Sequence, residues 1–357
     1  MLNSIFLQNL GSFGNAALHI IPLTKLTIFV GPNNAGKSQA FAAMNIVRHL
    51  LSGSLLSWNT LFYSLGSFQE AVHMHDVGRH ILVGMKFNGD RQFRYDIYPD
   101  NHYSVQYHEG TNLKMESGKI RHTTLEENYV AGTPEIWYFR PLRTLIPDSS
   151  RIGRIGEEGW QPIYPDGRNV IQFLLERFND RDPKWSDAEE WLRKIDPSMK
   201  MLKTPLLGEI TRAETVRSYG SSDASINMSF QGTGIQNAAT IISAIVFSPE
   251  GSTICIEEPE NFLHSRSQEV IVDLFNYATT ELNKQVIFST HSWSMILPYI
   301  SDVGKGEKRG STHVIGNPAD FSMVAFNPDS GPNKIQPYSI QDKEFRQVRD
   351  DFKKMWG

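Results

Sequence analysis

The chain has 357 residues, of which 40% are hydrophobic and 21% charged, the length of roughly two to three ordinary domains with enough apolar material for a sizeable core. Its 35 lysines and arginines stand against 39 aspartates and glutamates, a formal net charge of -4, so no overall field attracts nucleic acid or anionic membranes. The single cysteine, Cys255, excludes an internal disulfide framework and a multi-cysteine zinc site, and it fits a reducing cytosol.

We expect neither an export leader nor a membrane span. Residues 1–14 lack a basic segment followed by an apolar core. The longest apolar stretch, Ala238 to Phe247, is about half the length of a bilayer span. The sequence therefore predicts a cytoplasmic protein with no membrane partner.

The first fifty residues contain no acid and predict the order strand, turn, strand, loop, helix. The segment LTIFV, Leu26 to Val30, is almost uniformly apolar, which is typical of a strand buried on both faces. Apolar residues recur with helical spacing from Gln39 to Leu51, which predicts a helix there.

Between this strand and this helix lies Gly31-Pro-Asn-Asn-Ala-Gly36-Lys37-Ser38, which matches the phosphate-loop pattern Gly-x-x-x-x-Gly-Lys-Ser/Thr. The glycines let backbone N–H groups curl around an anion, and the start of the helix adds its positive end. Lys37 would then reach the β- and γ-phosphates of ATP, and the Ser38 hydroxyl would bind Mg²⁺. The predicted nucleotide-binding residues of this loop are Gly31, Asn33, Asn34, Ala35, Gly36, Lys37, Ser38 and Gln39.

The next segment, His80 to Met115, consists of short alternating runs. Turn signals at Asn88-Gly89-Asp90 and Pro99-Asp100-Asn101 separate the runs, which predicts an antiparallel meander. A stretch rich in glycine, proline and arginine follows from Tyr138 and is predicted to be a long ordered loop.

Two helices are expected after this loop, over Asn169–Phe178 and Ser186–Ile195. The second opens with Ser186 and Glu189 at the spacing of a capping box. We assign this region to a small, mainly helical insertion. Ser229 to Gln236 then forms a turn of small residues before an apolar helix. That helix start is a second potential anion site, and a plain turn before a core helix is the equal alternative.

The last third of the chain predicts a strand, a helix and a strand, which together form a unit of a parallel sheet. The first strand ends in Glu257-Glu258-Pro-Glu260. One carboxylate at a strand tip can hold Mg²⁺ and its neighbour can poise the attacking water, so we assign Glu257 to the metal and Glu258 to the water. The second strand ends in Ser-Thr-His291, whose imidazole can hydrogen-bond the γ-phosphate.

A locally basic stretch contains Arg140, Arg143, Arg151 and Arg154. One interpretation is a contact with the phosphates of DNA. The other is that these arginines pair with the acid-rich C-terminal half of the chain or with nucleotide phosphates.

The order of these motifs resembles that of the ABC-type ATPase heads of the RecF, structural-maintenance-of-chromosomes (SMC) and overcoming-lysogenization-defect (OLD) group. GPNNAGKS, a glycine-rich signature turn, ICIEEPE and FSTHS follow one another as in that group, and the likeness is closest to the OLD-like ATPases. It covers essentially the whole chain, from NSIFLQNLGSFG to about Ile300. The implied fold class is α/β, a P-loop NTPase of ABC-head type whose mixed sheet is joined by an antiparallel β subdomain and a helical insertion.

The resemblance implies catalytic roles for Lys37, for Glu258 as the catalytic glutamate and for His291 as the switch histidine. The signature here is QGTGIQ rather than LSGGQ, so Thr233 takes the place of the signature serine, with Gly234 beside it. Gln69, just before the meander, is the candidate for the metal-binding glutamine loop, along with Ser38 and Glu257 as metal ligands.

The resemblance also implies three parts. Residues 1–140 hold the phosphate loop and the meander of the first ATPase lobe. Residues 141–250 form a loop and helical second lobe that ends in the signature turn and helix. Residues 251–357 return to the first lobe with the acidic strand, the switch histidine and the tail.

The implied activity is Mg²⁺-dependent ATP hydrolysis by an ATP-bridged homodimer, in which the phosphate loop of one protomer faces the signature turn of the other. Such a dimer would act as a switch for a separate effector protein, a nuclease or a toxin, in prokaryotic defence against phage. The residues after His291 are too few for a toprim nuclease and contain no Asp-x-Asp, so we expect no nuclease activity in this chain. Two alternatives stay open: a RecF-like ATPase that binds DNA, and a nucleotide sensor that cages an effector without hydrolysis.

Overall fold

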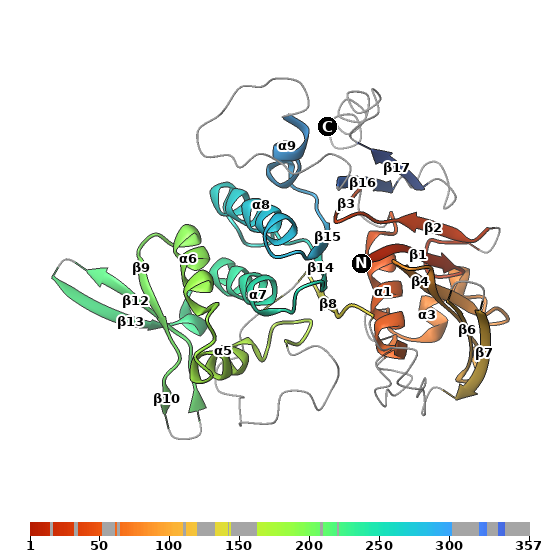
Figure 1. Cartoon of the computed structure of the whole chain (residues 1–357), viewed down its shortest axis with the longest axis horizontal. Helices are drawn as coiled ribbons and strands as arrows, with labels where there is room; N and C mark the ends of the chain where they lie inside the picture. The colour runs from red at the N-terminus through yellow and green to blue at the C-terminus, as the bar shows by residue number, and fades with distance from the viewer. Residues whose placement is uncertain are drawn as a thin grey trace. The chain divides into compact units, whose positions relative to one another are not determined.

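The computed structural model describes residues 1–14, 17–31, 35–51, 61–62, 65–109, 112–119, 133–141, 143, 163–207, 210–219, 221–301, 321–326 and 335–339. Contacts between residues divide the chain into two compact units (Figure 1). Unit 1 comprises residues 1–136, 158–160 and 317–357, and unit 2 comprises residues 137–157 and 161–316.

Unit 1 contains a six-stranded sheet in the order β2-β1-β4-β5-β6-β7, with antiparallel neighbours throughout. Its strands are β1 (Leu2–Gln8), β2 (His19–Pro22), β4 (Ile81–Phe87), β5 (Arg91–Ile97), β6 (His102–Glu109) and β7 (Asn112–Lys119). The predicted meander is confirmed and extends one strand further, through β7. Gly89 and Asp90 have φ angles of 79° and 58°, as the tight turn between β4 and β5 requires.

The other strands of unit 1 are β3 (Leu26–Val30), β16 (Phe321–Phe326) and β17 (Ile335–Ser339). β3 is buried at every position, as predicted, and it pairs in parallel with β16, which pairs antiparallel with β17. The predicted helix after the phosphate loop is α1 (Lys37–Leu51), which packs on β1 and β4. Two short elements, α3 (Phe68–Ala71) and η1 (His73–His75), follow it.

Unit 2 contains the predicted strand-helix-strand unit. β14 (Thr253–Glu257) and β15 (Gln285–Ser289) are buried at every position and pair in parallel, and α8 (Ser265–Thr280) connects them. β8 (Ile136–Phe139) lies on the other side of β14. Because the strands are parallel, the residues that follow Glu257 and Ser289 meet at one edge of the sheet.

Helices form the other layer of unit 2. They are α5 (Val170–Asn179), α6 (Trp185–Ile195), α7 (Thr233–Phe247) and α9 (Trp293–Ser301), with the short η3 (Met228–Phe230) before α7. α7 contacts both α6 and α8 (Figure 1). Twelve of the fifteen residues of α7 are buried. A helix that is enclosed by its neighbours in this way is apolar around most of its circumference, as the sequence of α7 is.

The two predicted helices of the insertion are confirmed as α5 and α6, and residues 199–227, for which the sequence predicts no element, follow them as strands. This segment forms a three-stranded antiparallel sheet, β13-β12-β9, and a short hairpin, β10-β11. The strands are β9 (Met199–Lys203), β10 (Leu206–Leu207), β11 (Ile210–Thr211), β12 (Glu214–Tyr219) and β13 (Ser222–Asn227). β13 has no buried position, so its polar sequence offers little of the alternation by which strands are recognised.

The prediction of a capping box at the start of α6 is wrong. The helix begins at Trp185, and its first flanking residue makes no side-chain cap. Glu189 instead accepts a hydrogen bond of 2.7 Å from the backbone N–H of Leu202. A tertiary contact with β9 therefore replaces the local one that the spacing suggested.

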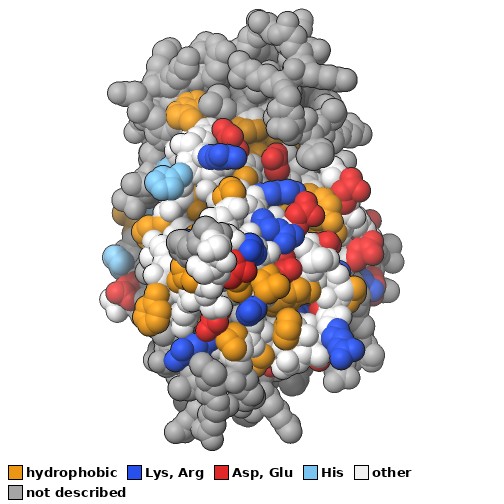
Figure 2. All heavy atoms as spheres, turned by 90° about the vertical axis from the view of Figure 1, so that its left-hand side faces the viewer, with side chains coloured by type: hydrophobic (Ala, Val, Ile, Leu, Met, Phe, Trp, Pro, Cys, Tyr) orange, Lys and Arg blue, Asp and Glu red, His pale blue; other side chains and the backbone are white. Residues whose placement is uncertain are grey.

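The surface carries both signs of charge. On the face shown in Figure 2, the described acidic and basic side chains are interspersed with apolar ones, in keeping with the small net charge of -4. Among the described residues, no helix has the length and apolar character needed to cross a membrane.

Candidate active site

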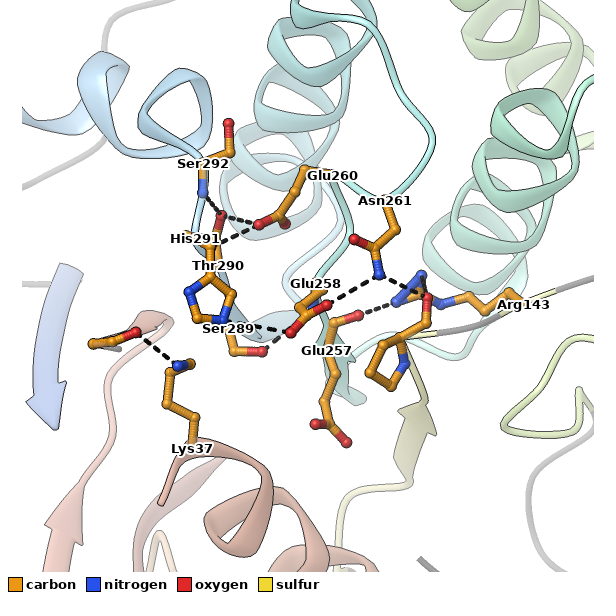
Figure 3. Close-up of polar contacts among 12 residues, drawn as sticks. Lys37, Arg143, Glu257, Glu258, Glu260, Asn261, Ser289, Thr290, His291 and Ser292 are labelled. Carbon is orange, nitrogen blue, oxygen red and sulfur yellow. Dashed lines mark hydrogen bonds and ion pairs between the residues drawn. The ribbon is translucent and has the colours of Figure 1, made fainter. Parts of the chain in front are cut away.

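The phosphate loop predicted from the sequence lies in unit 1, between β3 and α1. Lys37 is the first residue of α1 and is 6% exposed. Its ammonium donates a hydrogen bond of 2.7 Å to the carbonyl of Gly31 (Figure 3). The first turn of α1 contains no acid, so an anion here would meet an ammonium and the positive end of a helix.

The tight course of the loop depends on Gly36. Its φ angle is 108°, and a Cβ at this position would lie 2.8 Å from Oγ of Ser12 and 3.1 Å from the Phe13 ring. Of the other predicted residues, Ser38 is exposed and Ala35 and Gln39 are half-buried, whereas Asn33 and Asn34 lie outside the described residues. The described part of the loop fits a phosphate group.

In unit 2, Glu257 is the last residue of β14 and is 4% exposed. Its Oε1 accepts a hydrogen bond of 2.5 Å from the hydroxyl of Tyr138, which is fully buried in β8. Burial, together with the charge of Glu257, raises the pKa of the Tyr138 hydroxyl, so that hydroxyl stays a donor. The carboxylate is thereby held in one orientation. Carboxylate and hydroxyl oxygens such as those of Glu257 and Ser38 are ligands of the kind that Mg²⁺ prefers.

Glu258 is the first residue beyond β14 and has a φ angle of 46°, which is uncommon for a residue with a side chain. Its backbone N–H donates to the carbonyl of Ser289 at the end of β15. Its Oε1 lies 3.5 Å from Nε2 of His291, and both side chains are 31% exposed. The sheet edge therefore brings together the two residues that we predicted to poise the water and to sense the γ-phosphate (Figure 3).

Glu260, in the turn after β14, is joined to the turn after β15. Its Oε1 accepts hydrogen bonds of 2.7 Å from the Thr290 hydroxyl and from the backbone N–H of His291. Burial raises the pKa of the Glu260 carboxyl, and the bonds from Thr290 and His291 oppose this shift. Glu260 therefore fixes the main chain that carries His291.

Arg143 is fully buried. Its guanidinium donates to the backbone carbonyl of Glu257 and, at 2.6 Å, to Oδ1 of Asn237 on α7. Burial lowers the pKa of Arg143 to about 10, while Glu257 and Glu260 act in the opposite direction. For this arginine the structure supports pairing with the acidic half of the chain rather than contact with DNA. Arg151 and Arg154 lie outside the described residues.

The predicted signature turn opens α7. The helix starts at Thr233, four residues before the predicted start at Asn237, with Gly232 as the flanking residue and no side-chain cap. Gly232 and Thr233 are exposed. A Cβ on Gly234 would collide with the backbone carbonyl of Phe262, so this glycine lets α7 approach the turn that follows Glu258.

Gln69, the candidate for the glutamine loop, lies in α3 of unit 1 and its side chain is exposed. Its backbone carbonyl is 2.8 Å from Nδ1 of His75. Its role as a metal ligand stays a prediction.

Sequence reasoning missed three residues of the unit 2 cluster, Tyr138, Asn237 and Asn261, and it named Arg143 without its partners. Asn237 is 1% exposed, and Asn261 donates a hydrogen bond to Glu258. Tyr138 and Arg143 lie in the segment YFRPLR, which the sequence alone placed in a loop. The available signal was the polar side chain of Asn237 at the start of a predicted apolar helix.

Comparisons with known proteins relate part of the sequence to a family and the fold to solved structures. Residues 166–296 match the AAA ATPase domain family, a range that includes the signature turn, the acidic strand tip and His291. An Smc head bound to the C-terminal winged-helix domain of ScpA is similar in structure, with a TM-score of 0.58 and 15% identity over 95% of this chain and 98% of that one. An Smc head with an extended coiled coil, bound to the C-terminal domain of ScpA from Pyrococcus furiosus, gives a TM-score of 0.55 and 12% identity over 99% of both chains. The fold is therefore that of an SMC-type ATPase head, as expected.

Proposed function

We propose that this chain, with the fold of an SMC-type head and an AAA ATPase segment, hydrolyses ATP with Mg²⁺. Lys37 and the start of α1 bind the phosphates, Glu257 and Ser38 hold the metal, and Glu258 orients the attacking water. The metal would neutralise charge that develops on the phosphates.

One observation carries this proposal: the acid that should poise the water and the histidine that should contact the γ-phosphate are neighbours. Oε1 of Glu258 and Nε2 of His291 are 3.5 Å apart at the carboxyl edge of a parallel sheet, the edge at which open α/β sheets bind ligands. Both side chains remain 31% exposed, so each can still reach a substrate.

We further propose that ATP joins two copies of the chain, and that this dimer switches a separate effector. The exposed signature turn, Gly232 and Thr233, supports this, because a helix start without an acid or a cap is suited to a phosphate supplied from outside. Phe230, two residues before Gly232, is 80% exposed. Both similar Smc heads were solved with a bound ScpA domain, which makes a partner protein a reasonable expectation here. The resemblance to OLD-like ATPases extends the proposal to defence against phage.

The test measures phosphate release at several protein concentrations for the wild type, Lys37→Ala, Glu258→Gln and Glu269→Gln. The last variant changes an exposed glutamate of α8 and is the control. Lys37→Ala should lose ATP binding. Glu258→Gln should bind ATP, remain dimeric and turn over at least about a hundredfold more slowly. The specific activity of the wild type should fall as dilution separates the dimer.

Three results would contradict parts of the proposal. Equal turnover by Glu258→Gln and the wild type would favour a sensor that does not hydrolyse ATP. A specific activity that is constant down to nanomolar protein would exclude catalysis by a dissociable pair. The role in defence is tested by plating phage on cells that carry the gene with its neighbouring reading frames. Lys37→Ala should abolish protection and restore plaque formation. Unchanged protection by this variant would argue against a role of ATP in defence.

A further inference from the structure

We propose that Asn261 is a positioning residue for ATP hydrolysis: its side-chain amide holds the carboxylate of Glu258, and a buried asparagine and arginine hold Asn261 in turn. This inference rests on the proposed function, since it names the group that fixes the orientation of the proposed catalytic glutamate.

The first step is the contact itself. Nδ2 of Asn261 donates hydrogen bonds of 3.1 Å to Oε2 of Glu258 and 3.2 Å to the backbone carbonyl of Pro141. Both partners are acceptors, so only the amide nitrogen can face them. The orientation of this amide is therefore fixed by its surroundings.

Glu258 is thus contacted on both oxygens. Asn261 contacts Oε2 and His291 lies 3.5 Å from Oε1 (Figure 3). A glutamate side chain that is 31% exposed would otherwise sample several rotamers. Catalysis by a base needs its oxygen within hydrogen-bond reach of the water, so a group that restricts the carboxylate raises the fraction of productive geometries.

The second step is what holds Asn261. Nδ2 of Asn237 donates to the backbone carbonyls of Asn261, at 2.8 Å, and of Pro259, at 3.1 Å. Asn237 is 1% exposed, and its Oδ1 accepts from the buried Arg143 at 2.6 Å. Hydrogen bonds in the low-dielectric interior are electrostatically stronger than in water. The turn from Pro259 to Asn261 is therefore tied to α7.

The third step is that α7 begins with the signature turn. Gly234, in the first turn of α7, leaves no room for a Cβ against the backbone carbonyl of Phe262, the residue after Asn261, and Phe262 itself has a φ angle of 64°. If the signature turn moved, Gly234 would push on the backbone of Phe262, and the neighbouring amide of Asn261 would move with it. The same contacts would let occupancy of the signature turn adjust the Glu258 carboxylate.

The experiment measures kcat and KM for ATP, together with the Kd of ATP, for Asn261→Ala and Asn261→Asp in the full chain. Asn261→Ala removes the donor, and we expect kcat to fall about tenfold, the loss of one such hydrogen bond, with KM and Kd within about twofold. Asn261→Asp keeps the size of the side chain but places a second carboxylate against Glu258, so its kcat should fall further.

The matched control is Asn283→Asp. Asn283 also donates from Nδ2 to a glutamate, Oε1 of Glu250, at 3.0 Å in unit 2, and aspartate tolerates its φ angle of 49°. This variant changes the charge of unit 2 in the same way and should retain the kcat of the wild type. A melting temperature within about 2 °C of the wild type for each variant shows that folding is intact.

A double-mutant cycle separates positioning from a merely structural role. If Asn261 acts only through the Glu258 carboxylate, Asn261→Ala should not lower the residual kcat of Glu258→Gln by more than about twofold. A further tenfold loss in that background would overturn the inference, as would a wild-type kcat for Asn261→Ala. If Glu258→Gln loses turnover while Asn261→Ala is normal, this inference fails alone. If the wild type shows no turnover, the proposed function fails with it.

Discussion

The carboxylate of Glu260 accepts a hydrogen bond of 2.7 Å from the backbone N–H of His291, which joins the turns that follow two parallel strands. The same oxygen accepts from the Thr290 hydroxyl, whereas Oε2 is buried and has no hydrogen-bond partner within the part of the chain that the structure describes. The last acid of the Glu-Glu-Pro-Glu motif thus differs in role from the first two. It accepts hydrogen bonds from Thr290 and His291 and so supports the turn that follows β15.

Glu260→Ala should lower ATP turnover about tenfold, because the backbone of His291 loses its acceptor. Glu260→Gln retains an acceptor oxygen and should keep turnover within about threefold of the wild type. Steady-state kinetics at saturating ATP would measure both. A smaller effect for alanine than for glutamine would contradict this role.

Gly36→Ala should abolish ATP binding, since the new Cβ would press on Ser12 and Phe13 at a φ angle of 108°. Gly89→Ala is the matched control. Its φ angle of 79° is also positive, but no atom lies within 4 Å of the added Cβ, so it should cost roughly 1 kcal/mol of stability without an effect on ATP affinity. Binding of a fluorescent ATP analogue and thermal unfolding measure the two effects, and equal loss of binding in both variants would refute this explanation.

Tyr138→Phe should weaken the dependence of turnover on Mg²⁺, raising the Mg²⁺ concentration for half-maximal rate about tenfold or more. The reason is that the Tyr138 hydroxyl holds the Glu257 carboxylate at 2.5 Å. The variant should also lose about 1–3 kcal/mol of unfolding free energy, because a buried carboxylate loses a donor. Tyr98→Phe, at a partly exposed tyrosine, is the control. An unchanged Mg²⁺ requirement would mean that Glu257 does not hold the metal.

The stability of the protein should rise with pH above neutrality, because of Lys284. This side chain is 1% exposed and donates to the backbone carbonyls of Ile245 and Val246 in the last turn of α7. Burial lowers its pKa from 10.5 to about 7. Between these values the unfolded chain binds a proton that the folded chain releases, so the unfolding free energy increases with pH by at most about 1.4 kcal/mol per unit.

Urea unfolding at several pH values from neutral to alkaline would measure this slope for the wild type and for Lys284→Met. The variant lacks the titrating group and should give a flatter curve over the same range. Lys86→Met, at a lysine with 39% side-chain exposure, should keep the wild-type slope. Parallel curves for the wild type and Lys284→Met would show that this lysine is not the cause.

The sequence by itself determined the elements whose signal is local. β3, α1, the meander and the β14-α8-β15 unit follow from runs of apolar residues and from turn residues, because a buried strand or helix face must be apolar wherever it packs. The phosphate loop and the acidic strand tip could be found in the same way, since glycine and adjacent carboxylates carry their chemistry in their identity.

Tertiary structure alone decided which side chains serve these motifs. Tyr138 and Asn237 lie far in the sequence from Glu257 and Asn261, and neither has a local pattern that reveals its bond to these residues. Glu189 shows the same limit, because its capping-box spacing was outweighed by a bond to β9. Hydrogen bonds between distant segments depend on where the fold places each donor, and residue spacing does not contain that information.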